Sequence, residues 1–152
     1  MVEELLRRGR TMSCAESCTG GMIGAAVTDI PGASRVFLGS AVTYSNEAKM
    51  GLLGVSEDSL KAFGAVSDRV ASEMARGAVE AFGSDVSVAV TGIAGPGGAT
   101  DTKPVGLVYI AVADGPRTIV TRNVFKGDRA QIRGQTVSEA CRLLTDLLRG
   151  IL

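Results

Sequence analysis

Apolar residues along the chain recur with helical spacing in some segments and form short unbroken runs in others. Apolar positions at i, i+3, i+4 and i+7 mark one face of a helix, and runs of four to eight apolar or β-branched residues mark strands. The helical faces expected on this basis are Ile23, Ala26, Val27 and Ile30; Val70, Met74, Ala78 and Phe82; and Ile132, Val137, Ala140, Leu144, Leu147 and Leu148. The short runs predict strands at 11–15, 36–44, 86–90, 107–113 and 118–125.

Capping residues set the limits of the expected helices. Serine and aspartate favour helix N-caps, and glycine favours helix ends. A charged N-terminal segment around Leu5 and Leu6 predicts one more short helix, and 114–116 form a turn that makes the two last strands an antiparallel pair. The resulting order, with helices between the early strands and a late hairpin, predicts a layered α/β domain with a mixed sheet. The expected helix limits are Met22 to Pro31, Ser45 to Leu53, Ser56 to Gly64, Ser67 to Gly83 and Asp128 onward.

Composition narrows the class of protein. The 152 residues suit one domain, 1–152, and with 45% hydrophobic but only 4% aromatic residues its core must be aliphatic and rich in alanine. The formal net charge of zero argues against binding to nucleic acid through excess positive charge. No apolar run reaches membrane-span length, so we expect a cytoplasmic protein that binds neither nucleic acid nor membrane. The three cysteines lack the spacing of a metal finger and predict free thiols.

The chain contains no histidine. This excludes a Ser-His-Asp triad and any site that needs imidazole ligands. A hydrolase built on this sequence therefore needs another general base.

Ser17 lies where an expected strand ends and a helix is about to begin, in the segment Ala15–Gly21. A nucleophile on such a turn is exposed, and backbone N–H groups at the helix start, here from Thr19, Gly20 and Gly21, can stabilise an oxyanion. The alternative is that Ser17 or Thr19 only caps the helix. Cys18 is a competing nucleophile, but without a histidine to lower its pKa it is more typical of a buried small residue.

Lys49 is the candidate base. It falls near the start of the helix that follows Tyr44, Ser45 and Asn46, and both the helix dipole and burial would lower the pKa of its amine. A neutral lysine can deprotonate a serine, and Tyr44 can relay the proton. The alternative is a solvated lysine beside a core tyrosine.

Two further segments suit a ligand. The Gly/Pro-rich stretch 91–106 directly follows a strand and offers backbone donors, beginning with Thr91 and Gly92, although it could be a mere connection. Arg129 and Arg133 lie one turn apart at the start of the last helix, where they suit a bound anion such as phosphate or simply face solvent.

Six motifs in order resemble the CinA C-terminal domain family, the nicotinamide-nucleotide amidases. The matching segments are AESCTGG (15–21), VTYSNEAK (42–49), GAVS (64–67), TGIAGPGG (91–98), KPVG (103–106) and GDR (127–129). The family usually has a third glycine where Ala99 stands, and the first helix is short. The chain also resembles the stand-alone form, which lacks the larger preceding domain.

The resemblance implies a three-layer α/β/α domain with a mixed, mostly parallel sheet. It implies hydrolysis of nicotinamide mononucleotide to nicotinate mononucleotide and ammonia, in pyridine-nucleotide salvage, without metal or cofactor, by a homo-oligomer. Carried over to this sequence, Ser17 is the nucleophile and Lys49 with Tyr44 its activating pair. Thr91 and Gly92 line the reacting amide, and Arg133 holds the nucleotide. Two other functions stay open: a catalytically silent nucleotide-binding or regulatory module associated with competence, and an amidase for another small amide.

Overall fold

The computed structural model describes residues 1–152, and its elements follow the predicted order. A short 3₁₀ helix, Ala33–Arg35, precedes the second strand. The elements are α1 (Val2–Arg8), β1 (Met12–Glu16), α2 (Met22–Thr28), β2 (Phe37–Val42), α3 (Asn46–Leu53), α4 (Glu57–Phe63), α5 (Asp68–Phe82), β3 (Val86–Gly92), β4 (Leu107–Asp114), β5 (Arg117–Val124) and α6 (Arg129–Arg149).

The predicted N-caps are confirmed. Ser45 Oγ accepts a hydrogen bond from the backbone N–H of Ala48, at 3.1 Å, and so opens α3. Ser56 and Ser67 cap α4 and α5 in the same way, and Asp128 opens α6 through a reciprocal capping box. Each such cap contributes about 1 kcal/mol to stability and fixes the residue at which its helix begins. The start of α3 is thereby fixed relative to Lys49.

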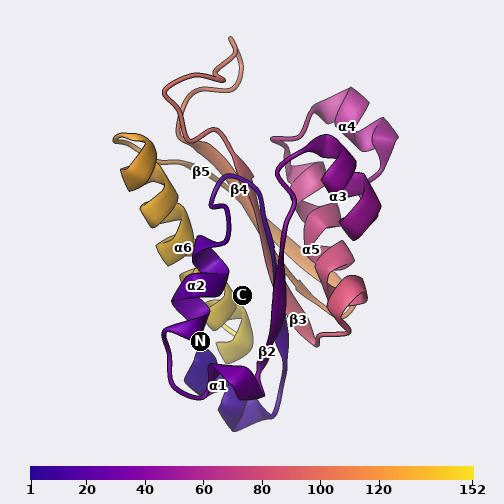
Figure 1. Cartoon of the computed structure of the whole chain (residues 1–152), viewed down its shortest axis with the longest axis vertical. Coiled ribbons are helices and arrows are strands. Elements are labelled where there is room, and N and C mark those ends of the chain that lie inside the picture. Colours follow the sequence, from indigo (N-terminus) through magenta and orange to yellow (C-terminus); the bar gives the residue numbers. More distant parts are fainter.

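The five strands form one mixed sheet in the order β2-β1-β3-β4-β5. β1 pairs in parallel with β2 and β3, whereas β4 is antiparallel to both β3 and β5. Four strands therefore run in one direction and β4 in the other, which confirms the mixed, mostly parallel sheet. Figure 1 shows α3, α4 and α5 on one face and α1, α2 and α6 on the other, the three predicted layers.

The two faces of the sheet are packed with side chains of different size. The α1/α2/α6 face buries a cluster of 22 residues that is mostly Val, Leu, Ile and Met. The α5 face buries 11 residues, of which seven are alanine. Small side chains let α3 approach α5 closely: a Cβ on Gly77 of α5 would lie 1.9 Å from the carbonyl oxygen of Leu53. This close approach brings α3, and Lys49 with it, over the end of β1.

Three details of the predicted elements are wrong. The strand predicted at 36–44 is β2, Phe37–Val42, so Tyr44 lies beyond its end. α2 ends at Thr28, so Ile30 leaves the apolar face and is 44% exposed; the proline at position 31 disfavours helical backbone in the residue before it. Thr91 and Gly92 belong to β3 and pair with Tyr109 and Val108, so the glycine-rich loop starts at Ile93. No helix combines the length and the apolar character needed to cross a membrane.

Candidate active site

Ser17 lies directly after β1, at the carboxyl end of that strand, as predicted. Its backbone N–H donates to the carbonyl of Val90 on β3, at 3.2 Å, and the side chain is only 9% exposed. The turn that follows uses Gly20 and Gly21 in left-handed backbone conformations, with φ of 61° and 100°. Glycine adopts these angles without steric cost, so the chain can reverse within four residues and enter α2.

Lys49, on the first turns of α3, reaches Ser17 from across the sheet edge. Its Nζ lies 3.1 Å from Ser17 Oγ, 2.7 Å from the carbonyl oxygen of Thr43 and 3.2 Å from that of Tyr44. The side chain is 1% exposed. None of the seven ion pairs in the molecule includes Lys49, so this buried amine has oxygen neighbours but no carboxylate partner.

This environment suits a neutral amine. Burial lowers the pKa of Lys49 below its ordinary value of 10.5, and the nearby Cys18 thiol opposes the shift only in part. A neutral amine carries two N–H groups and one lone pair. The carbonyls of Thr43 and Tyr44 can take the two N–H groups, which leaves the lone pair for the hydroxyl proton of Ser17. The arrangement can therefore remove a proton from Ser17.

A cavity of about 270 Å³ opens in front of this pair. Its walls come from the Ser17 turn, the β2–α3 connection, the α4–α5 connection and the loop after β3. Thr91 lines it and also donates its hydroxyl to the carbonyl of Ala65, at 2.8 Å, which ties β3 to the opposite wall. The predicted site residues that line the cavity are Ser17, Tyr44, Lys49, Thr91, Gly92 and Arg129.

Glu16, the residue before Ser17, was missed as a site residue from the sequence. It is completely buried on the α2 side of β1, and no cation pairs with it. Its signal in the sequence is a charged residue that ends an apolar strand just before a glycine-rich helix start. Its carboxylate accepts five hydrogen bonds, from the hydroxyls of Thr19 and Ser40 and from the backbone N–H groups of Gly21, Ile23 and Gly24.

Because Glu16 accepts from backbone N–H groups of the turn, it limits which of them stay free to bind an oxyanion. The N–H of Gly21 is bound to Glu16, and that of Gly20 to the carbonyl of Ser17, so neither is free for an oxyanion. The N–H groups of Cys18 and Thr19 donate to no oxygen of the protein, and neither does that of Ala94 on the facing loop. Cys18 and Ala94 both line the cavity.

Several predicted binding residues lie away from the cavity wall. Thr19 is fully buried with its hydroxyl on Glu16, at 2.6 Å, and Asn46 is exposed at the start of α3. Gly20 and Gly21 form the turn behind Ser17. None of these four residues lines the cavity.

The two arginines of α6 have different surroundings. Arg129 lies at the cavity mouth and donates to the carbonyl of Gly95, at 2.8 Å, and to the Tyr44 hydroxyl, at 3.3 Å. Arg133 donates to the carbonyls of Cys18 and Thr19, at 3.0 and 2.9 Å, and does not line the cavity. The Tyr44 ring is 64% exposed, and its hydroxyl meets Arg129 instead of Ser17 or Lys49.

Cys18 is poorly suited to act as a nucleophile. Its side chain is 6% exposed, and burial raises the pKa of its thiol to about 11. The thiolate, which is the reactive form, is therefore scarce at neutral pH. No group of three or more His, Cys, Asp and Glu side chains is placed to hold a metal ion.

Comparison with known proteins identifies the family to which the chain is similar. The model of the CinA C-terminal domain matches residues 1–148. The CinA-like protein of Endomicrobium trichonymphae is 55% identical over 140 residues, which cover 92% of this chain and 33% of that protein. The CinA-like protein of Gloeothece citriformis is 47% identical over 150 residues, covering 99% and 36%. The chain thus spans about a third of the length of these curated relatives.

Solved structures show the same fold. The competence/damage inducible protein CihA from Agrobacterium tumefaciens superposes with a TM-score of 0.93 at 42% identity, covering 96% of this chain and 90% of that one. The competence damage-inducible protein A (ComA) from Klebsiella pneumoniae gives 0.94 at 34% identity, covering 97% and 91%.

Proposed function

We propose that this chain, which belongs to the CinA C-terminal domain family, is an amide hydrolase. In this proposal Ser17 is the nucleophile and Lys49 is the general base. The observation that carries the proposal is the 3.1 Å contact between Ser17 Oγ and the Nζ of a buried lysine that has no carboxylate partner. Burying a lysine without an ionic partner costs stability, so its presence beside a serine hydroxyl points to a role in activating that hydroxyl.

The steps of the reaction follow from the role of Lys49 as proton acceptor. Neutral Lys49 takes the Ser17 proton as Oγ attacks the carboxamide carbon, and the resulting ammonium then protonates the departing nitrogen, which leaves as ammonia. Water enters, loses a proton to Lys49 and attacks the acyl-enzyme. The carboxylic acid leaves, and Ser17 regains its proton. One water is consumed and one ammonia released in each cycle.

Backbone donors on two sides of the cavity suit the oxyanion. Cys18, whose N–H is free, follows the nucleophile directly, and Ala94, whose N–H is also free, lines the cavity from the loop after β3. Donors fixed in this way stabilise the negative charge that develops on the carbonyl oxygen. Thr91 and Gly92 then line the carboxamide, as the resemblance implies.

The substrate we propose is nicotinamide mononucleotide, which the family resemblance supplies. The positively charged guanidinium of Arg129 lies at the cavity mouth, where it can bind the phosphate of the nucleotide. The resemblance assigns Arg133 to the nucleotide. In this proposal Arg133 instead holds the nucleophile turn in place by donating to the carbonyls of Cys18 and Thr19. A cytoplasmic location, a role in pyridine-nucleotide salvage and homo-oligomerisation also belong to the proposal.

The test is ammonia release from nicotinamide mononucleotide, with nicotinate mononucleotide measured as the second product. Ser17→Ala should lower the rate by about a thousandfold or more. Ser138→Ala, on the exposed side of α6, should not change it. Free nicotinamide should be a much poorer substrate because it lacks the phosphate. Tight nucleotide binding without ammonia release would favour the silent binding module, and full activity of Ser17→Ala would remove the nucleophile assignment.

A further inference from the structure

The nucleophile turn and the start of α2 converge on one buried carboxylate, that of Glu16. We infer that Glu16 is a positioning residue, which fixes the Ser17 turn so that Oγ stays within hydrogen-bond reach of Lys49. The inference rests on the proposed function and assigns a role in it to a residue that touches neither the cavity nor Lys49.

The five donors come from three separate parts of the chain. Oε2 accepts from Thr19 Oγ1 at 2.6 Å and from the N–H groups of Gly21 and Ile23 at 3.0 Å, all in the turn or the first turn of α2. Oε1 accepts from the N–H of Gly24 at 2.9 Å and, at the same distance, from Ser40 Oγ on β2. One carboxylate therefore joins the turn and the helix start to the neighbouring strand.

The position of Ser17 in the chain explains why this matters for its side chain. Ser17 is the first residue after Glu16, and Thr19, two residues further on, returns to the same carboxylate. The serine is thus held on both sides by one anchor. On β3, the Val90 carbonyl fixes its backbone N–H. A displacement of about 1 Å in such a turn can lower a rate a hundredfold, because attack and proton transfer both need close contact.

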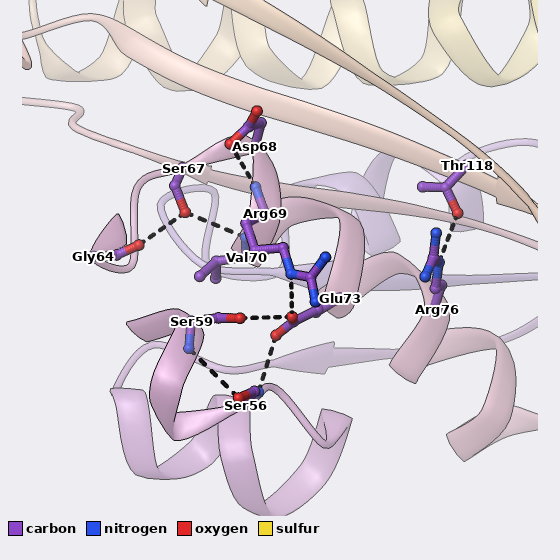
Figure 2. A network of polar contacts seen from close by, with 10 residues as sticks. All are labelled: Ser56, Ser59, Gly64, Ser67, Asp68, Arg69, Val70, Glu73, Arg76 and Thr118. Atoms are coloured by element: carbon purple, nitrogen blue, oxygen red, sulfur yellow. Dashed lines mark hydrogen bonds and ion pairs between the residues drawn. The ribbon is translucent and has the colours of Figure 1, made fainter. Parts of the chain in front are cut away.

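Glu73 provides a matched comparison away from the cavity. It also holds the start of a short helix: it accepts from the N–H of Ser56 at 3.0 Å and from Ser59 Oγ at 2.7 Å, and it pairs with Arg69 at 2.8 Å (Figure 2). Glu73 lies on α5 and does not line the cavity. The same substitution at the two sites therefore separates loss of a helix anchor from loss of the nucleophile's position.

The experiment compares Glu16→Gln with Glu73→Gln in the full chain. Glutamine keeps the shape of the side chain but turns one acceptor oxygen into a donor, which opposes the donors at that end. Both variants should lower Tm by a few degrees. Only Glu16→Gln should lower kcat, by about tenfold to a hundredfold, with KM nearly unchanged. Equal kcat in the two variants, or an equal fall in both, would overturn the inference.

A second pair of variants serves if Glu16→Gln fails to fold. Thr19→Val removes the donor on the nucleophile turn, and Ser40→Ala removes the donor on β2. We expect Thr19→Val to lower kcat roughly tenfold more than Ser40→Ala does. Equal effects on kcat would mean that Glu16 only stabilises the fold.

A crystal structure separates failure of this inference from failure of the proposed function. The distance from Ser17 Oγ to Lys49 Nζ, 3.1 Å here, should grow by about 0.5 Å or more in Glu16→Gln or Thr19→Val, and stay unchanged in Glu73→Gln. An unchanged distance in all variants would overturn the positioning role, whatever the substrate. An inactive wild type with a displaced serine in Glu16→Gln would contradict only the proposed function.

Discussion

The two sides of the Ser17 turn each bury an ionisable side chain without an ionic partner, and they do so in opposite ways. Behind the turn, Glu16 accepts five hydrogen bonds, so its oxygens are fully used by the fold. In front of it, Lys49 meets two carbonyls and one hydroxyl, and only the hydroxyl can give up a proton. A buried carboxylate surrounded by fixed donors is suited to holding structure, whereas a buried amine that contacts a hydroxyl proton is suited to chemistry.

The two side chains also differ in what they contribute to stability. The hydrogen bonds of Glu16 join three elements, so its removal loosens the fold. Lys49 has a pKa lowered by burial, which means that folding disfavours its ammonium form. The lysine is therefore kept at a cost in stability, as is common where a group is needed for activity.

Lys49→Met should have the largest effect. Methionine matches the length of lysine without a buried amine, so we expect kcat to fall about a thousandfold while Tm rises by a few degrees. Ammonia release and thermal unfolding measure the two effects. Lys61→Met is the control, because Lys61 is exposed in an ion pair with Glu57 and should change neither value much. A Lys49→Met protein that is active, or markedly less stable, would contradict the contrast between the two sides.

The arginines of α6 should give the next largest effect and separate binding from positioning. Arg129→Ala removes the cation at the cavity mouth, and we expect KM for the nucleotide to rise about tenfold to a hundredfold. Arg133→Ala frees the carbonyls of Cys18 and Thr19, so its main effect should be on kcat and Tm. Steady-state kinetics of both variants test this. The reverse pattern, with KM raised only in Arg133→Ala, would assign the phosphate to Arg133.

The pH dependence follows from the direction of the Lys49 shift. Activity needs the neutral amine, so kcat/KM should rise about tenfold for each pH unit and level off above the folded pKa, which burial sets below 10.5. Stability has the same sign: between the folded and unfolded pKa values the unfolded chain binds more protons, so stability rises with pH in that window. The stability advantage of Lys49→Met should accordingly be greatest below the folded pKa and shrink above it. A flat rate profile would exclude Lys49 as the base.

Local pattern predicted most of the fold. Caps, glycines and apolar spacing are short-range features, and they located the helices to within a residue or two. The misplaced details are Ile30, the end of β2 and the start of the loop after β3, and each depends on where a helix or a strand pairing stops. Thr91 and Gly92 join β3 because β4 continues to pair with them, which nothing in their own segment indicates.

The site was only partly predictable because it depends on which strands become neighbours. Ser17 and Lys49 are 32 residues apart, and they meet because β1 and β2 pair in parallel, so that both chains leave the sheet at the same edge. Local pattern selected each residue separately. One donor to Glu16, Ser40, comes from the neighbouring strand β2, and the carbonyl partners of Arg133 are more than 100 residues away. The sequence marks Glu16 as a charged strand end, but it does not show these partners.

Tyr44→Phe should have the smallest effect and tests how the environment of Lys49 is built. The Tyr44 carbonyl accepts from Lys49, whereas the exposed ring places its hydroxyl against Arg129. Phenylalanine keeps the carbonyl and removes one exposed hydrogen bond, so we expect kcat within about twofold of wild type and KM raised by at most about fivefold. Because the backbone supplies two of the three neighbours of the amine, the base should survive loss of the hydroxyl. A fall in kcat of a hundredfold or more would show that the hydroxyl moves into the site with substrate and relays the proton.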